Sequence, residues 1–291
     1  MLLLALVLIL AAAFLHAGWN VLVKVSKDAL ALMWWGSFLG TVGYGVWVLT
    51  FSNIYLNSAS WLPFLISAAA ETGYFVTLVR GYSEGDLSIV YPISRGGAPI
   101  FAAIWSAIIL GERLSFLGYC GVGLIVGGIF LVSFPIERQE SAKQSFRLIS
   151  FKKSVVLWAF ACAVFISIFS VSDKVAVAGT APLVYNWWVI AGNTLFWSPI
   201  VWRKSRLKIN IQEIKTNLYA AIGTGIGISS AYAAALAALA LTSASYVVAG
   251  RGLSVVIGSA VGALFLKESF GRQRILGAII MVSGLALIAF S

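Results

Sequence analysis

The fold is decided by a run of apolar residues near the start of the chain, LLLALVLILAAAFLHAGWNVLV, which covers residues 2–23. A helix needs about 20 consecutive apolar residues to cross the hydrocarbon core of a bilayer, and this run is long enough. Its first part, residues 1–15, resembles the core of a signal peptide. Because it lacks a basic segment and the apolar run continues to Val23, we expect a membrane span that is retained.

The composition of the whole chain points to the same class of protein. Of its 291 residues, 60% are hydrophobic and only 10% are charged, against about 25% charged in an average soluble domain. The mean hydropathy is +0.96. Soluble enzymes, nucleic-acid-binding proteins and disordered proteins do not have this composition. We therefore predict an all-α integral membrane protein, with the lipid bilayer as its surroundings and no nucleic-acid partner.

Turn signals and polar segments divide the apolar sequence into ten predicted transmembrane helices. They cover residues 2–23, 29–51, 61–80, 86–110, 115–134, 154–176, 183–202, 216–241, 244–266 and 273–290. The longest connections, 135–153 and 203–215, are polar and basic. The first connection separates five spans from five, so we predict a first repeat (1–134), a basic linker (135–153) and a second repeat (154–291).

The two predicted repeats resemble each other in sequence. A shift of 156 residues places Arg95-Gly96 on Arg251-Gly252 and Glu112 on Glu268, with ten identities over residues 71–135. Repeats with an odd number of spans necessarily point in opposite directions across the membrane. The chain is therefore predicted to have the inverted-repeat architecture of many secondary transporters.

The net charge of +10 is explained by orientation rather than by an acidic partner. Sixteen Lys and Arg residues lie in connections that follow odd-numbered spans, and only Arg113 and Lys174 lie in those that follow even-numbered spans. Lys and Arg collect in cytoplasmic loops. We therefore predict that loops 135–153 and 203–215 are cytoplasmic, that both termini are external, and that the protein lies in the plasma membrane (the inner membrane of a bacterium).

Glu71 is the one acidic residue near the middle of a predicted span. A carboxylate at this depth is costly, and such residues are usually functional or paired. A medium of low dielectric favours the neutral, protonated carboxyl group, so Glu71 is a candidate for proton coupling or for binding a substrate amine. The structural alternative is an ion pair with Arg95 or Arg251, or a position beside a wet cavity.

Arg95 and Arg251 are the arginines that lie well inside predicted spans. Each can hold a carboxylate or phosphate through two parallel hydrogen bonds, or it can lock helices together through carbonyl groups. Prolines and glycines around Arg95 predict a kinked or unwound fourth span, and Gly252 predicts a milder weakness in the ninth. The predicted hinge residues are Pro92, Gly96, Gly97, Pro99 and Gly252. The other candidate binding residues near these helices are Tyr74, Tyr91 and Ser94.

His16, Asn20 and Lys24 recur every four residues and are therefore predicted to lie on one face of the first span. We include His16 and Asn20 among the candidate binding residues. A single histidine more often makes helix contacts, and an asparagine here more often bonds across helices. Asp173 and Lys174, near the end of the sixth span, are interpreted as a local ion pair or a gate element, with the structural role preferred.

Several classes of function have no support in the sequence. It lacks HExxH, GxSxG, a GKS or GKT loop and paired intramembrane aspartates, so we predict no enzyme, no metal site and no cofactor other than protons. No filter motif indicates a channel. Pairs of the GxxxG type permit close helix packing and are compatible with a homodimer.

Three motifs together resemble the EamA-type members of the drug/metabolite transporter superfamily. They are His16-Ala17-Gly18-Trp19-Asn20 with Lys24, Gly85-Asp86-Leu87-Ser88-Ile89-Val90-Tyr91-Pro92-Ile93-Ser94-Arg95-Gly96, and Leu110-Gly111-Glu112-Arg113-Leu114. The resemblance covers the whole chain. It implies a ten-helix, two-repeat carrier, usually an exporter of amino acids or other small metabolites.

The chain departs from the family pattern in two respects. Similar proteins often carry Glu after the ninth-span arginine, where this chain has Gly252, and relatives are usually drawn with both termini in the cytoplasm. We predict a secondary active exporter of small organic anions or zwitterions that works by alternating access and binds its substrate through Arg95. The alternative is a lipid or lipid-linked headgroup translocase of the same superfamily. A membrane assembly factor without transport activity is a third hypothesis.

Overall fold

A computed structural model describes residues 2–24, 26–84, 87–133, 153–203, 206–257 and 272–290, and within these ranges the chain is helical and contains no strand. The long helices of the first half are α1 (Leu2–Lys24), α2 (Ala29–Phe51), α3 (Trp61–Glu84), α4 (Leu87–Trp105) and α5 (Phe116–Ser133). The second half contributes α6 (Lys153–Ala176), α7 (Pro182–Val201), α8 (Leu207–Thr216), α9 (Leu218–Leu241), α10 (Ala244–Arg251) and α12 (Arg272–Ala289). A short 3-10 helix (Ser58–Ser60) precedes α3, and a π-helical turn (Ser106–Leu110) continues α4.

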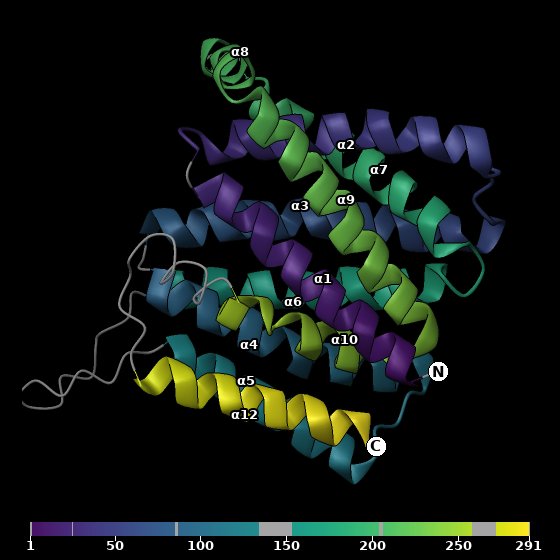
Figure 1. Cartoon of the computed structure of the whole chain (residues 1–291), viewed down its shortest axis with the longest axis vertical. Coiled ribbons are helices and arrows are strands. Elements are labelled where there is room, and N and C mark those ends of the chain that lie inside the picture. The colour runs from purple at the N-terminus through teal and green to yellow at the C-terminus, as the bar shows by residue number, and fades with distance from the viewer. Residues whose placement is uncertain are drawn as a thin grey trace, which may run out of the picture.

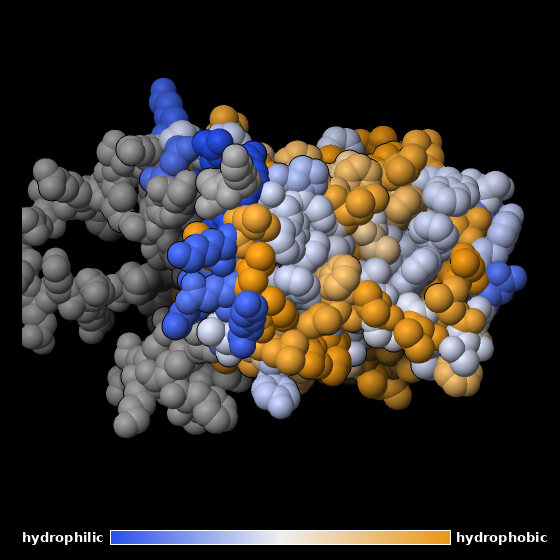
Figure 2. Space-filling model, turned by 90° about the horizontal axis from the view of Figure 1, so that it is seen from above, coloured by the Kyte–Doolittle hydropathy of each residue, from blue (hydrophilic) through white to orange (hydrophobic). Residues whose placement is uncertain are grey.

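The helices are those of an integral membrane protein. Five of the described helical segments are long and apolar enough to cross a bilayer: Leu3–Val23, Ala29–Phe51, Ile93–Leu110, Lys153–Ala176 and Leu218–Leu241. Shorter apolar helices cover Phe116–Val132, Ala244–Ile257 and Ile275–Ile288. Figure 2 shows hydrophobic side chains over much of the visible surface and hydrophilic ones gathered at one end. The all-α membrane fold is therefore confirmed, whereas the total of ten spans stays a prediction.

The long helices pair across the two halves of the sequence. The closest packing joins α1 to α9, α3 to α6 and α5 to α12, and α2 also packs on α7 and α9 (Figure 1). Two of these contacts depend on glycine, because a Cβ added to Gly121 would lie 2.7 Å from the carbonyl oxygen of Gly284, and one added to Gly36 would lie 2.7 Å from Thr224 Cγ2. Small residues thus let these helix backbones approach each other.

The fourth span was predicted to be kinked or unwound, and the structure shows that it is not unwound. Helix α4 remains α-helical from Leu87 to Trp105, through Pro92, Gly96, Gly97 and Pro99. A proline has no backbone N–H group, so each of the two prolines removes one hydrogen bond from the helix. Helices that pack against neighbours in a membrane tolerate this loss.

The stronger interruption lies in the ninth span. Helix α10 ends at Arg251, Gly252 and Leu253 form a turn, and helical structure resumes at Ser254. The amide nitrogens of Gly252 and Leu253 bond the carbonyl oxygens of Ala249 and Gly250 at 2.9 and 3.0 Å. Gly252 was predicted to weaken its helix less than the prolines and glycines of α4 do, yet α10 is the helix that ends, directly before Gly252.

One predicted connection is itself helical. Most of the basic segment 203–215 belongs to α8, which begins at Leu207 and ends one residue beyond the segment, at Thr216. The other basic connection, 135–153, lies outside the described residues except for Lys153, as does the end of the predicted ninth span after Ile257.

Candidate functional site

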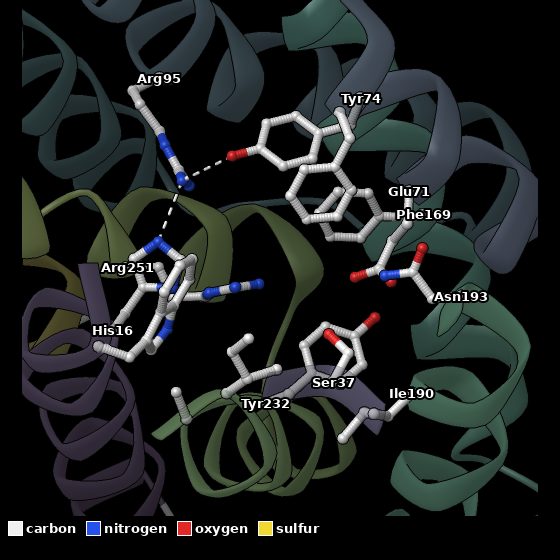
Figure 3. A pocket seen from close by; sticks show the side chains of 14 residues that line it. His16, Ser37, Glu71, Tyr74, Arg95, Phe169, Ile190, Asn193, Tyr232 and Arg251 are labelled. Atoms are coloured by element: carbon white, nitrogen blue, oxygen red, sulfur yellow. Dashed lines mark hydrogen bonds between the residues drawn. The ribbon is translucent and has the colours of Figure 1, made fainter. Parts of the chain in front are cut away.

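A cavity lies among helices of both halves (Figure 3). Its volume is about 650 Å³ with the space at its mouth included. The lining side chains come from α1, α2, α3 and α4 and from α6, α7, α9 and α10. They are His16, Trp19, Ser37, Glu71, Tyr74, Phe75, Arg95, Phe169, Ile190, Asn193, Ile228, Ala231, Tyr232 and Arg251. The walls are mostly apolar and aromatic with a few polar groups, as is typical of sites for small molecules.

Arg95 reaches the cavity from α4 and is held by hydrogen bonds. Its Nη2 atom lies 3.1 Å from His16 Nε2 and donates to the hydroxyl of Tyr74 at 3.2 Å. A guanidinium group only donates hydrogen bonds, so the Nε2 atom of His16 must accept and the imidazole is neutral. The guanidinium carbon also lies 5.8 Å from the centre of the Tyr74 ring, close enough for a cation–π contact.

Arg251 reaches the same cavity from the last residue of α10 and is held more loosely. Its guanidinium carbon lies 5.9 Å from the centre of the Tyr232 ring. Within the described part of the chain, the guanidinium group makes no hydrogen bond to the protein. Figure 3 shows this side chain extended into the cavity. A group with several unused donors in a cavity of low dielectric is suited to bind an anion.

Glu71 and Asn193 lie on the side of the cavity opposite the two arginines (Figure 3). In the described ranges, Glu71 forms no ion pair with Arg95 or Arg251, so the structural alternative of an internal ion pair is not supported. The side-chain oxygen of Asn193 is buried and has no hydrogen-bond partner among the described residues. The cavity therefore has a positive side and a side with oxygen acceptors.

A buried network lies directly behind the cavity, centred on Asp173 of α6. The Asp173 side chain is 1% exposed. One of its carboxylate oxygens accepts from Ser67 at 2.6 Å and from Tyr185 at 3.0 Å, and the other accepts from Tyr232. Because Tyr232 also lines the cavity, this network joins α3, α6, α7 and α9 around the site.

Asp173 and Lys174 do not form the local ion pair that their sequence positions suggest. The Nζ atom of Lys174 donates instead to the carbonyl oxygens of Leu239 at 2.6 Å and Thr242 at 2.9 Å, and it lies 3.9 Å from Glu112. Glu112 in turn accepts from the backbone nitrogen of Ala244 at 3.2 Å. Lys174 and Glu112 thus hold the connection between α9 and α10.

The structure brings some of the predicted binding residues together and leaves others apart. Five of them line the cavity: His16, Glu71, Tyr74, Arg95 and Arg251. Asn20 is exposed, bonds the carbonyl of His16 at 2.6 Å and lies outside the lining. Ser94 is buried beside Arg95 without lining the cavity. The side chains of Tyr91 and Pro92 lie outside the described side chains.

Sequence reasoning missed part of the lining. Asn193 lies in an apolar span, and a polar amide in such a position was the signal that could have identified it. Ser37, Phe75 and Phe169 carry no signal of this kind, because small polar and aromatic residues are common in membrane helices. In the part of the chain that the structure describes, no three His, Cys, Asp or Glu side chains are grouped to hold a metal ion.

Comparisons with known proteins agree with this architecture. The sequence model of the EamA-like transporter family matches residues 3–134 and 153–290. A transmembrane protein 234 homolog from Dictyostelium discoideum is 26% identical over 122 residues, which make up 42% of this chain and 88% of that protein. A solved structure described only as a crystal structure of a protein has a TM-score of 0.74 over 97% of this chain and 95% of its own, at 14% identity. This last likeness concerns the fold alone.

Proposed function

The chain belongs to the EamA-like transporter family, whose members are membrane transporters of the drug/metabolite type. From this premise we propose that it is a secondary active carrier of small zwitterionic or anionic metabolites such as amino acids. One observation carries the proposal. A single cavity contains two arginines on one side and a carboxylate with an unpartnered amide oxygen on the other.

The two sides of the cavity match the two charges of a zwitterion. Arg251 offers donors to a carboxylate through two parallel hydrogen bonds, and Arg95 adds positive charge close by. Glu71 and Asn193 offer oxygen acceptors to an ammonium group. The aromatic side chains Trp19, Phe75 and Phe169 supply the apolar wall against which a short hydrocarbon side chain would pack.

Alternating access between two inverted repeats is the mechanism that we propose. It is supported by the pairing of helices, because α1 packs on α9 as α6 packs on α3, and these pairs interchange when the halves are exchanged. It is also supported by the family match, which falls on residues 3–134 and again on 153–290. Carriers of this type bind substrate at the interface of the repeats, where this cavity lies.

Glu71 is proposed as the group that couples transport to protons. The ionised Glu71 side chain binds the substrate amine, and the protonated side chain releases the amine. A proton and the substrate therefore compete for one site. Such competition exchanges an inward-moving proton for an outward-moving metabolite and corresponds to export. Proteoliposomes test this step, because Glu71→Gln should abolish the dependence of transport on a proton gradient. Full gradient dependence in that variant would contradict it.

Substrate class can be tested with the full chain reconstituted in proteoliposomes. We expect at least one radiolabelled amino acid to exchange across the membrane, and its analogues without the carboxylate or without the amine to exchange at least about tenfold more slowly. Movement of a labelled phospholipid between leaflets, with no exchange of amino acids, amines or carboxylates, would favour the headgroup translocase instead.

Orientation is proposed from the distribution of charge in the sequence, with the basic connections cytoplasmic and both termini external. A reporter that is active only in the cytoplasm, fused after residue 291, should be silent. An active fusion would reverse the orientation and leave the proposed substrate class unchanged.

A further inference from the structure

Helix α8 does not run with the other helices. In Figure 1 it is seen nearly end-on at the top of the molecule, whereas the neighbouring helices α2, α7 and α9 run across the picture. It lies between the end of α7 at Val201 and the start of α9 at Leu218. A helix at the end of a transmembrane bundle and across its direction lies along the membrane surface.

The side chains of α8 are arranged with polar groups inward and apolar groups outward. Asn210 is fully buried and Glu213 is 3% exposed, whereas Leu207, Ile209 and Ile211 are 45%, 45% and 39% exposed. A surface helix in water has the opposite arrangement. Exposed branched aliphatic side chains beside lysines are favourable at the boundary between headgroups and acyl chains, where the aliphatic groups leave water.

The inward polar groups attach α8 firmly to the bundle. The side-chain amide of Asn210 donates to the carbonyl oxygen of Val201 at 2.6 Å, and the backbone carbonyl of Asn210 accepts from the indole of Trp35 at 3.0 Å. Glu213 accepts from Asn217 at 2.7 Å. The outward face of α8 is therefore held in one orientation.

The outward surface near α8 carries positive charge. Lys208 and Lys215 on the helix are exposed, and Arg203 before it is exposed as well. The acidic side chains nearby are engaged elsewhere, because Glu213 faces inward and Asp28 is bound by Arg206 at 2.6 Å. Phosphate groups of anionic lipids would therefore meet lysines here with no competing carboxylate on the outward face of α8.

We infer that α8 is a binding element for the headgroups of anionic phospholipids in the surrounding bilayer. Leu207, Ile209 and Ile211 enter the acyl boundary, and Lys208 and Lys215 contact the phosphates above it. The inference rests on the chain being a membrane transporter and not on the identity of its substrate.

Thermal unfolding of the purified full chain in detergent tests the charged part of this surface. Phosphatidylglycerol should raise the unfolding temperature at concentrations at which phosphatidylcholine does not. The double variant Lys208→Gln/Lys215→Gln should need at least about fivefold more phosphatidylglycerol for the same rise, since two charge contacts are lost. The matched double variant Lys27→Gln/Lys153→Gln, which removes two exposed lysines outside α8, should respond as the wild type does.

A spin label at residue 211 tests the apolar part. In a chain with Cys120→Ala and Cys162→Ala, a label on Ile211→Cys in phosphatidylglycerol nanodiscs should be more accessible to oxygen than to a water-soluble nickel complex. The inference is overturned if both lipids shift the unfolding temperature equally, if the Lys208/Lys215 variant keeps the full shift, or if the label is accessible as in water. None of these measurements uses a transport substrate, so their failure would leave the proposed carrier function standing.

Discussion

The two halves of the chain each place one acid and one arginine at the centre of the molecule, and they hold them in opposite ways. In the first half, Arg95 is held by His16 and Tyr74, while Glu71 has no ion pair or hydrogen bond to its side chain in the described ranges. In the second half, Asp173 is held by three hydroxyl groups, while the contact of the Arg251 guanidinium with the described residues is the one with the Tyr232 ring.

The difference separates groups that shape the cavity from groups that are available to a substrate. Arg95 and Asp173 use their hydrogen-bonding capacity within the protein and so fix the positions of neighbouring helices. Glu71 and Arg251 keep their capacity, and they lie on opposite sides of the cavity (Figure 3). Each half thus contributes one held charge and one charge that is ready for a ligand.

The largest expected effect comes from removing the held acid. Asp173→Ala would leave the hydroxyls of Ser67, Tyr185 and Tyr232 without their acceptor, at a cost of about 2–4 kcal/mol in the free energy of unfolding. The unfolding temperature in detergent should fall clearly. The unfolding temperature of the Asp173→Asn variant, which keeps one acceptor oxygen, should fall less. Wild-type stability of the alanine variant would show that the network does not hold these helices together.

The next largest effect is expected at the free arginine. Arg251→Ala should weaken substrate binding about 100-fold, because a charge-assisted pair of hydrogen bonds is lost, and it should leave the unfolding temperature almost unchanged. Arg95→Ala should lower both the affinity for substrate and the unfolding temperature, since His16 and Tyr74 lose the hydrogen bonds that Arg95 gives them. Binding to purified protein and thermal unfolding measure the two effects, with Arg113→Ala, at an exposed position outside the cavity and α8, as a control. Equal losses of stability in the two cavity variants would erase the distinction between held and available charges.

A smaller effect is expected at the free acid. Glu71→Gln should weaken binding of an amino acid by about tenfold, since one charge contact with the amine is lost. Binding of the matching carboxylic acid without an amine should be unaffected. Glu84→Gln serves as the control, because Glu84 binds the Trp158 indole at 3.1 Å away from the cavity. An equal loss of affinity for the amino acid and for the carboxylic acid would show that the amine does not bind at Glu71.

The smallest effect is expected at the interrupted helix. A Cβ on Gly252 would lie 2.7 Å from Ile129 Cδ1 and 2.8 Å from the carbonyl oxygen of Ala249. Gly252→Ala should therefore slow exchange several-fold while substrate affinity stays close to that of the wild type, as expected for a hinge. Gly97→Ala, whose Cβ would lie 3.2 Å from Ala163 Cβ on the continuous helix α4, should slow exchange less. If Gly97→Ala slowed exchange more than Gly252→Ala does, the hinge would lie in α4 instead.

The helices of the first half were predictable nearly to their ends. Residues 29–51 form α2 as the apolar run indicates, and Asp28, which accepts from the backbone nitrogen of Ala31 at 2.9 Å, begins it. Membrane helices are easy to locate because a long apolar run has few alternatives in a bilayer. The state of α4 was not predictable, because residues that break an isolated helix are tolerated when packing compensates for the lost hydrogen bond.

Sequence alone determined that this protein spans a membrane and which charges lie within it, because apolar length and buried charge are properties of the chain itself. Only the tertiary structure decided which of those charges are held and which are available. The sequence favours Arg95 and suggests that Asp173 and Lys174 are a local ion pair or a gate element, but the partners of a side chain come from helices distant in sequence. The hydroxyls that hold Asp173 lie on α3, α7 and α9, and no spacing along the chain encodes their approach.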